Sequence, residues 1–141
     1  MSTLVDTDLI IDALYGIERI LADLERLAME GVAISVITLA EVLDGSQRAP
    51  DPNRAVADAR YFLRGYGILP ITDHVAEVFA ETRAYLRRAG NLIPDLDLLI
   101  ASTAIVHDLT LLTRNHRHFA RVPGLRLYDD GQRSLGTTPD S

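Results

Sequence analysis

The chain has 141 residues, of which 48% are hydrophobic and none is cysteine. This length matches one compact domain, and the hydrophobic fraction is enough to fill a core without disulfides or a structural metal. Because cysteine is absent, disulfide scaffolds, cysteine-zinc sites and thiol nucleophiles are excluded. We expect a soluble, cytoplasmic protein with no membrane contact, because no segment resembles a signal peptide or approaches the roughly 18 apolar residues of a membrane span.

The formal charge is −6, from 20 acidic and 14 basic residues, and every basic residue is an arginine. An acidic chain is a poor candidate for holding nucleic acid through a broad positive surface. It remains a good candidate for an enzyme that gathers carboxylates around metal ions, because bound cations reverse the local field. Any mechanism that needs a lysine is excluded.

Apolar spacing and turn residues predict alternating short strands and helices. In chain order we expect a strand at 4–5, helices at 9–14 and 17–28, a strand at 32–35, a helix at 38–47, a turn at 49–52, a helix ending near 66, a strand at 68–71, a helix at 73–86, a loop at 90–94, a strongly apolar helix at 95–107, and strands at 111–113 and 125–128. Short strands between helices indicate a parallel sheet covered on both faces, which is a three-layer α/β/α fold. We expect one domain over residues 1–130 and a polar, flexible tail over 131–141.

Ligands of such sheets bind beyond the carboxyl ends of the strands, so polar residues at those points are candidates for chemistry. Asp6 directly follows the first strand, where it is either an N-cap of the next helix or a metal ligand, and one carboxylate can do both. Glu41 follows the second strand, but Thr38 to Glu41 also matches a helix capping box.

Two later positions complete the candidate set. Asp97 lies in the first turn of the apolar helix, with Asp95 as the expected cap. The helix dipole explains why one acid is tolerated in the first turn. It does not explain two acids beside so apolar a helix, because burying a carboxylate is costly unless it is paired or binds a metal. Asn115 lies in the Thr113–Asn115 segment after the fourth strand, which is also compatible with an ordinary turn.

Carboxylate and amide oxygens are ligands that Mg²⁺ prefers, and Mn²⁺ is a plausible substitute. Such a site suits phosphodiester hydrolysis, because the metal polarises phosphoryl oxygens, activates water and stabilises the departing oxygen. Two histidines near the C-terminal end, His116 and His118, lack a third histidine nearby and are better explained as loop residues than as a transition-metal site.

Four segments resemble the motifs of the PIN-domain family, in the same order and spacing. They are Val5-Asp6-Thr7-Asp8, Thr38-Leu39-Ala40-Glu41, Asp97-Leu98-Leu99-Ile100-Ala101 and Leu112-Thr113-Arg114-Asn115. The resemblance extends to about residue 128, and the chain is most similar to the VapC-type toxins of bacterial type II toxin–antitoxin pairs. It implies a Mg²⁺-dependent endoribonuclease that is restrained by a cognate antitoxin.

By the same resemblance, Asp6, Glu41 and Asp97 would bind the metal, and Asn115 would complete the catalytic group. Many relatives have an acid where this chain has Asn115 or His118, so the number of metal ions is left open. The expected RNA contacts are the guanidinium groups and one imidazole near the site, with a solvated helix face as the alternative for Arg83. These residues are Arg83, Arg87, Arg88, Arg114, Arg117 and His118.

Two interaction surfaces are also expected. The helix at 95–107 is apolar on more faces than one core needs, which predicts a homodimer. The first two helices offer apolar side chains to an antitoxin helix, namely Ile10, Leu14, Ile17 and Leu21.

Two other functions compete with the nuclease. A metal-dependent phosphatase of the haloacid-dehalogenase type would explain Asp6 and Asp8 after the first strand, but it relies on a lysine that this chain lacks. A non-catalytic PIN-like interaction domain, in which the carboxylates only cap helices, stays open.

Overall fold

The computed structural model describes residues 2–128, so the predicted tail at 131–141 lies outside the described residues. Its strands are β1 (Thr3–Val5), β2 (Val32–Ser35), β3 (Gly67–Leu69), β4 (Thr110–Leu112) and β5 (Arg126–Leu127). Its helices are α1 (Thr7–Leu14), α2 (Glu18–Ala28), α3 (Val36–Gln47), α4 (Pro52–Phe62), the short 3-10 turn η1 (Leu63–Gly65), α5 (Asp73–Ala89), α6 (Asp95–Val106) and α7 (His116–Phe119). None of the helices in residues 2–128 has the length and apolar character needed to span a membrane.

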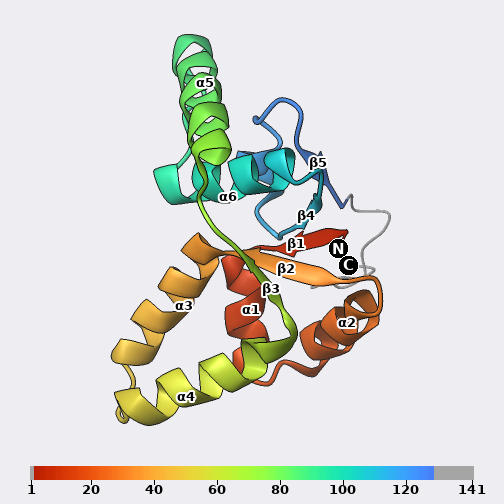
Figure 1. Ribbon diagram of the computed structural model, residues 1–141, viewed down its shortest axis with the longest axis vertical. Coiled ribbons are helices and arrows are strands. Elements are labelled where there is room, and N and C mark those ends of the chain that lie inside the picture. The colour runs from red at the N-terminus through yellow and green to blue at the C-terminus, as the bar shows by residue number, and fades with distance from the viewer. Residues whose placement is uncertain (1, 129–141) are drawn as a thin grey trace.

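The five strands form one parallel sheet in the order β3-β2-β1-β4-β5, with β1 at its centre (Figure 1). In the register, Leu4 of β1 lies beside Ala33 of β2 and Leu111 of β4. Because all strands run the same way, the loops after β1, β2 and β4 lie along one edge of the sheet. This edge carries the candidate site.

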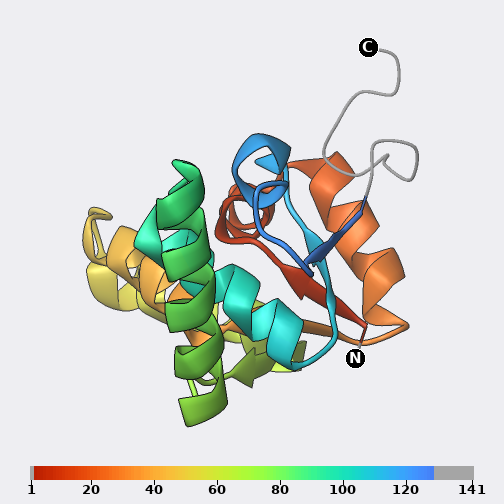
Figure 2. The same cartoon turned by 90° about the horizontal axis from the view of Figure 1, so that it is seen from above.

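Successive side chains of each strand enter opposite cores, as a pleated strand requires. Val5, Ile34 and Leu112 pack into one core with α1, α2, α3 and α4. Their neighbours Leu4 and Leu111 pack into a second core with α5, α6 and α7. Figure 2 shows the sheet between these two helical layers. The predicted three-layer α/β/α fold is confirmed.

The apolar helix α6 buries most of its length inside the monomer. Its buried residues are Leu98, Ile100, Ala101, Ser102, Thr103 and Ala104, whereas Leu96 is 46% exposed. The second core and α5 therefore account for most of the apolar faces on which the homodimer prediction was based. The homodimer stays a prediction, now supported by fewer exposed apolar residues of α6.

The start of one helix and the cap of another differ from the sequence prediction. Helix α3 begins at Val36 because Ser35 Oγ accepts a hydrogen bond from the Ile37 N–H at 3.0 Å, so Thr38 is not its cap. Helix α5 begins at Asp73, as predicted, and is capped by Thr72. The N-cap position of α6 is Pro94, so the prediction of Asp95 as the cap was wrong.

Most other boundaries moved by at most three residues. Helix α4 ends at Phe62 rather than near residue 66, and the short helix α7 was not predicted at all. It begins directly after Asn115, at the edge of the sheet that carries the candidate site.

Candidate active site

Asp6 stands at the point where β1 ends and α1 begins. Its Oδ1 accepts a hydrogen bond from the Thr7 N–H at 2.8 Å, so the predicted cap is real. Its Oδ2 accepts a hydrogen bond from the Thr113 hydroxyl at 2.7 Å, across from the end of β4. The side chain is thus fixed from two neighbouring strands, and the residue is only 5% exposed.

Glu41 faces the same corner from α3. The Thr7 hydroxyl donates to Glu41 Oε1 at 2.6 Å and lies 2.9 Å from the Thr38 hydroxyl. The Thr7 hydroxyl is the donor in both contacts, so its single hydrogen is shared between the Glu41 carboxylate and the Thr38 hydroxyl oxygen. The capping-box explanation of Thr38 and Glu41 is therefore wrong, because both side chains point to α1 instead of their own helix end.

Asp97 approaches from the first turn of α6 and is linked to the segment after β4. Its Oδ2 lies 3.5 Å from His118 Nδ1, which also lies 2.9 Å from the Asn115 side-chain nitrogen. When His118 Nδ1 has no hydrogen it accepts from Asn115, and when it carries one it donates to Asp97. Asp6 and Asp97, with Glu41 beside them, are called the acid cluster below. Asn115 therefore contacts the acid cluster through His118.

Burial and mutual repulsion characterise the two aspartates. Burial raises the pKa of Asp6 from 3.8 to about 6, although hydrogen bonds from Thr113 and Thr7 act in the opposite direction. The negative charges of Asp97 and Asp8 raise the pKa of Asp6 further. Burial also raises the pKa of Asp97, against the opposing contact with His118. Neighbouring carboxylates whose pKa values are raised in this way are candidates for binding a cation.

The donor set fits a hard divalent cation in its chemistry. The groups near Asp6 and Asp97 are mainly carboxylate, hydroxyl and amide oxygens, which suit Mg²⁺ or Mn²⁺, together with the imidazole of His118. Within residues 2–128, no three His, Asp or Glu side chains converge closely enough to hold an ion together. Glu41 in particular is turned to Thr7, so the full three-carboxylate set stays a prediction.

The arginines near this edge have different surroundings. Arg114 pairs with Asp12 of α1 through Nη2 and Oδ2, 2.5 Å apart. Arg83 pairs with Asp95 at 3.0 Å, which leaves it less available for an RNA phosphate. Arg117 is exposed and forms no ion pair with any residue between 2 and 128.

Sequence reasoning missed the hydroxyl partners of the acids. The sequence does contain Thr7 beside Asp6 and Thr113 after β4, but nothing in the spacing shows that these hydroxyls donate to Glu41 and Asp6. It also missed Asp12 as the partner of Arg114, because helical spacing alone does not bring those elements together.

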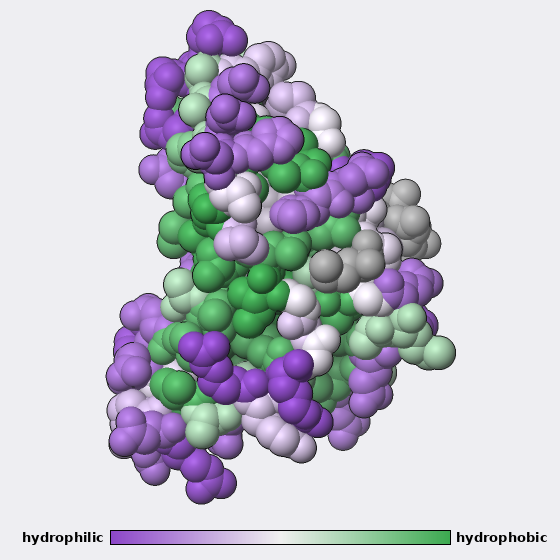
Figure 3. All heavy atoms as spheres, in the orientation of Figure 1, coloured by the Kyte–Doolittle hydropathy of each residue, from purple (hydrophilic) through white to green (hydrophobic). Residues whose placement is uncertain are grey.

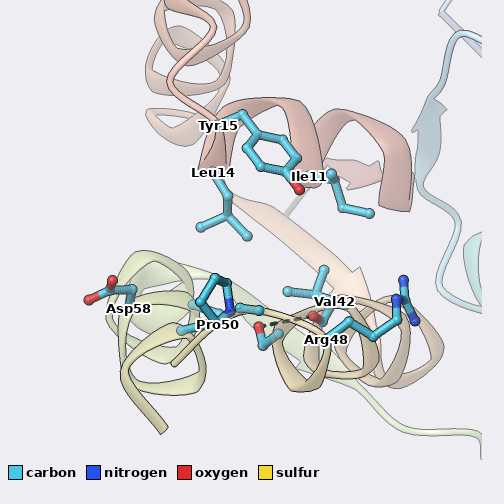
Figure 4. A pocket seen from close by; sticks show the side chains of 12 residues that line it. Ile11, Leu14, Tyr15, Val42, Arg48, Pro50 and Asp58 are labelled. Atoms are coloured by element: carbon cyan, nitrogen blue, oxygen red, sulfur yellow. Dashed lines mark hydrogen bonds between the residues drawn. The ribbon is translucent and has the colours of Figure 1, made fainter. Parts of the chain in front are cut away.

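An apolar groove opens further along α1, between the C-terminal half of that helix and the α3–α4 hairpin. It has a volume of about 550 Å³. Figure 4 shows Ile11 and Leu14 of α1, with Tyr15 directly after the helix, facing Val42 and Pro50 across it. The prediction of an apolar surface on the first two helices was right for Leu14, which lines this groove, and for Ile17, which is 41% exposed. It was wrong for Ile10, which is fully buried in the core.

Comparison with known proteins places these features in a family. The PIN domain family model matches residues 3–125. Ribonuclease VapC1 of Methanocaldococcus jannaschii is 34% identical over 128 residues, which cover 89% of this chain and 86% of that protein. The tRNA(fMet)-specific endonuclease VapC of Salmonella typhimurium is 33% identical over 98 residues, which cover 70% of this chain and 74% of that protein.

Solved structures agree with this assignment. A chain of the Rickettsia felis VapBC2 crystal structure, bound to a DNA fragment from its promoter, has a TM-score of 0.84 and 31% identity, covering 91% of this chain and 98% of that chain. A chain of FitAcB from Neisseria gonorrhoeae has a TM-score of 0.79 and 30% identity, covering 93% of this chain and 99% of that chain. The chain therefore belongs to the PIN-domain family, in the group that contains the VapC proteins.

Proposed function

We propose that this chain is a metal-dependent endoribonuclease and the toxin of a toxin–antitoxin pair, active in the cytoplasm. The observation that supports it most is that Asp6 and Asp97, from distant parts of the sequence, lie near enough at the strand edge of a PIN fold for the charge of Asp97 to raise the pKa of Asp6. Their raised pKa values are a cost that a purely structural cap does not require. Relatives of similar length include proteins named as ribonucleases.

In this proposal Asp6 and Asp97 hold Mg²⁺, or Mn²⁺ in its place, and Glu41 joins them from α3. The bound cation would supply charge stabilisation for the phosphoryl oxygens and for the leaving oxygen of the RNA strand. Thr113 and Thr7 orient the acids, because each hydroxyl donates to one carboxylate. Loss of hydrogen bonds that orient metal ligands commonly lowers metal affinity or activity by about 10- to 100-fold.

The RNA strand would approach from the side of the segment after β4. Arg117 is exposed there, and its guanidinium, which pairs with no group among the described residues 2–128, matches phosphate oxygens well. His118 bridges Asn115 and Asp97, so it is suited to hold the Asp97 carboxylate and contact the substrate at the same time.

The toxin role requires a partner that restrains the nuclease, and the neighbouring solved structures include toxin–antitoxin complexes. We assign the groove between α1 and the α3–α4 hairpin to an apolar helical segment of the antitoxin. Arg48 and Asp58 also line the groove and offer charged contacts that fix the direction of the segment.

A growth experiment tests the proposal in cells. Induction of the wild-type chain should arrest growth and leave new RNA 5′ ends, which sequencing identifies, whereas the Asp6→Ala chain should do neither. Co-expression of the cognate antitoxin should restore growth and yield a stable complex. Harmless expression of a folded wild-type chain would refute the toxin role.

The competing function, a non-catalytic PIN-like interaction domain, gives a different result. It predicts antitoxin-like binding at the groove with no RNA cleavage under any metal condition. No specific observation favours the phosphatase.

A further inference from the structure

Three consecutive residues after β4 contact three different parts of the molecule. Thr113 donates its hydroxyl to Asp6, and Asn115 reaches His118 of α7. Between them, Arg114 turns to the second turn of α1 and pairs with Asp12. The segment is therefore attached to the acid cluster on both sides of Arg114, and Arg114 attaches it to α1.

The contact between Asp12 and Arg114 is close and partly sheltered from water. Asp12 Oδ2 lies 2.5 Å from Arg114 Nη2, and the two side chains are 20% and 39% exposed. This oxygen is buried and forms no well-directed hydrogen bond with any group in residues 2–128, so the contact is ionic in character. A buried carboxylate oxygen needs such a cation, which makes the position of the guanidinium well determined.

The remaining donors of Arg114 are open. A guanidinium carries five N–H groups in a rigid plane, and only Nη2 faces Asp12. The other nitrogens form no hydrogen bond or ion pair within the described part of the chain, and more than a third of the side chain is exposed. A planar edge held in place next to the acid cluster matches two oxygens of one phosphate.

We propose that Asp12 is a positioning residue for RNA binding, because its carboxylate holds the Arg114 guanidinium so that the free edge contacts a backbone phosphate of the strand. This inference rests on the proposed ribonuclease function. Fixing the flexible side chain before the RNA arrives lowers the entropy lost on binding. The role of Asp12 is indirect, since Arg114 is the residue that touches the RNA.

The test compares Asp12→Asn with Asp108→Asn. Each variant removes one negative charge, but Asp108 pairs with Arg126, near the opposite ends of the strands. Asp108 has a φ of 59°, a conformation that asparagine also adopts readily, so the control should fold. Long-range electrostatics alone predicts that both variants bind RNA slightly more tightly. Positioning by Asp12 predicts weaker binding for Asp12→Asn only.

The measurement is fluorescence anisotropy of a short, labelled single-stranded RNA of mixed sequence, with the full chain and a chelator that prevents cleavage. Arg114→Ala should weaken binding about tenfold and lower the slope of log K against log salt by about 0.7. Asp12→Asn should weaken binding about threefold or more, and should have no further effect in the Arg114→Ala background.

Binding of Asp12→Asn as tight as that of Asp108→Asn would overturn the assignment, as would a full extra loss in the Arg114→Ala background. If Asp12→Asn does not fold, Arg114→Lys decides instead. A lysine keeps the charge but not the planar edge, so it should keep the wild-type salt slope but bind RNA more weakly than the wild type, and wild-type affinity would overturn the proposal.

The outcome separates this inference from the function on which it rests. If the variants show the expected binding pattern but the wild type cleaves no RNA with Mg²⁺, the nuclease function is refuted and the positioning role of Asp12 stands. If the wild type cleaves RNA but its affinity for RNA does not depend on Asp12, only the positioning role of Asp12 is refuted.

Discussion

The ionised Asp6 carboxylate should make the free protein less stable near neutral pH, and Asp6→Asn should relieve this. The pKa of Asp6 is about 6 in the folded chain against an ordinary value of 3.8, a difference worth about 3 kcal/mol at about 1.4 kcal/mol per tenfold change. Asparagine keeps an acceptor for the Thr7 N–H but weakens the bond with Thr113, at a cost of about 1 kcal/mol. The expected net gain is about 2 kcal/mol.

The pH dependence follows from the sign of the shift. A carboxyl whose pKa is higher in the folded state binds its proton more tightly there, so the wild type gains stability as pH falls from about 6 towards about 4. The advantage of Asp6→Asn should therefore be full above about pH 7 and shrink towards about pH 4.

Thermal unfolding followed by circular dichroism measures this. At about pH 7.5 the melting temperature of Asp6→Asn should exceed that of the wild type by about 5–10 °C for a chain of this size. Asp73→Asn, an exposed acid in the first turn of α5, serves as the control and should change stability by less than about 1 kcal/mol. Added Mg²⁺ should stabilise the wild type more than Asp6→Asn. An equal or lower melting temperature for Asp6→Asn would refute the reasoning.

Three further predictions concern the support of the site, the groove and self-association. Thr7→Val removes the donor to Glu41 and should lower the RNA cleavage rate about tenfold, whereas Thr103→Val, which loses a hydroxyl bond within α6, should keep near wild-type activity. Ala55→Arg, inside the groove, should prevent co-purification of the antitoxin and leave ribonuclease activity unchanged. Ala57→Arg, on the exposed face of α4, should leave both antitoxin binding and activity unchanged. Equal antitoxin binding by the two variants would contradict the groove assignment. Light scattering should give a dimer at micromolar concentration, and a monomer alone would contradict the homodimer prediction.

The surface in the view of Figure 3 is consistent with an interacting protein. Hydrophilic residues cover the two ends over α5 and α4, while apolar residues gather across the middle (Figure 3). Ile68 of the edge strand β3 is 38% exposed, which is unusual for an apolar side chain in a strand. Exposed apolar surface of this kind is common where a partner chain binds.

Periodicity predicted the layers well because it depends on local sequence. The alternation of Leu4 and Val5, and the apolar positions of each helix, report directly on which side chains face the core. Helix starts were less predictable, because Ser35 and Thr38 are both good caps and only the path of the chain after β2 selects between them. Propensity alone does not carry that information.

The acids of the site were predictable for a different reason. Asp6 and Glu41 follow strands, and parallel strands bring their carboxyl ends together whatever the intervening sequence is. The hydroxyl network and the pairing of Asp12 with Arg114 depend on exact side-chain directions, which spacing does not determine. The same applies to the groove, where Ile10 was expected at the surface but packs inward.

Cleavage of RNA by the wild type and by Asp97→Asn tests the central claim most directly. Asp97→Asn preserves the shape of the side chain and its place in the first turn of α6, so the variant should fold. Wild-type protein should cleave RNA with Mg²⁺ and stop when a chelator is added, and Asp97→Asn should be slower by about 100-fold or more at every Mg²⁺ concentration. A folded Asp97→Asn chain that cleaves RNA at the wild-type rate, or wild-type cleavage that continues unchanged in the chelator, would contradict the account.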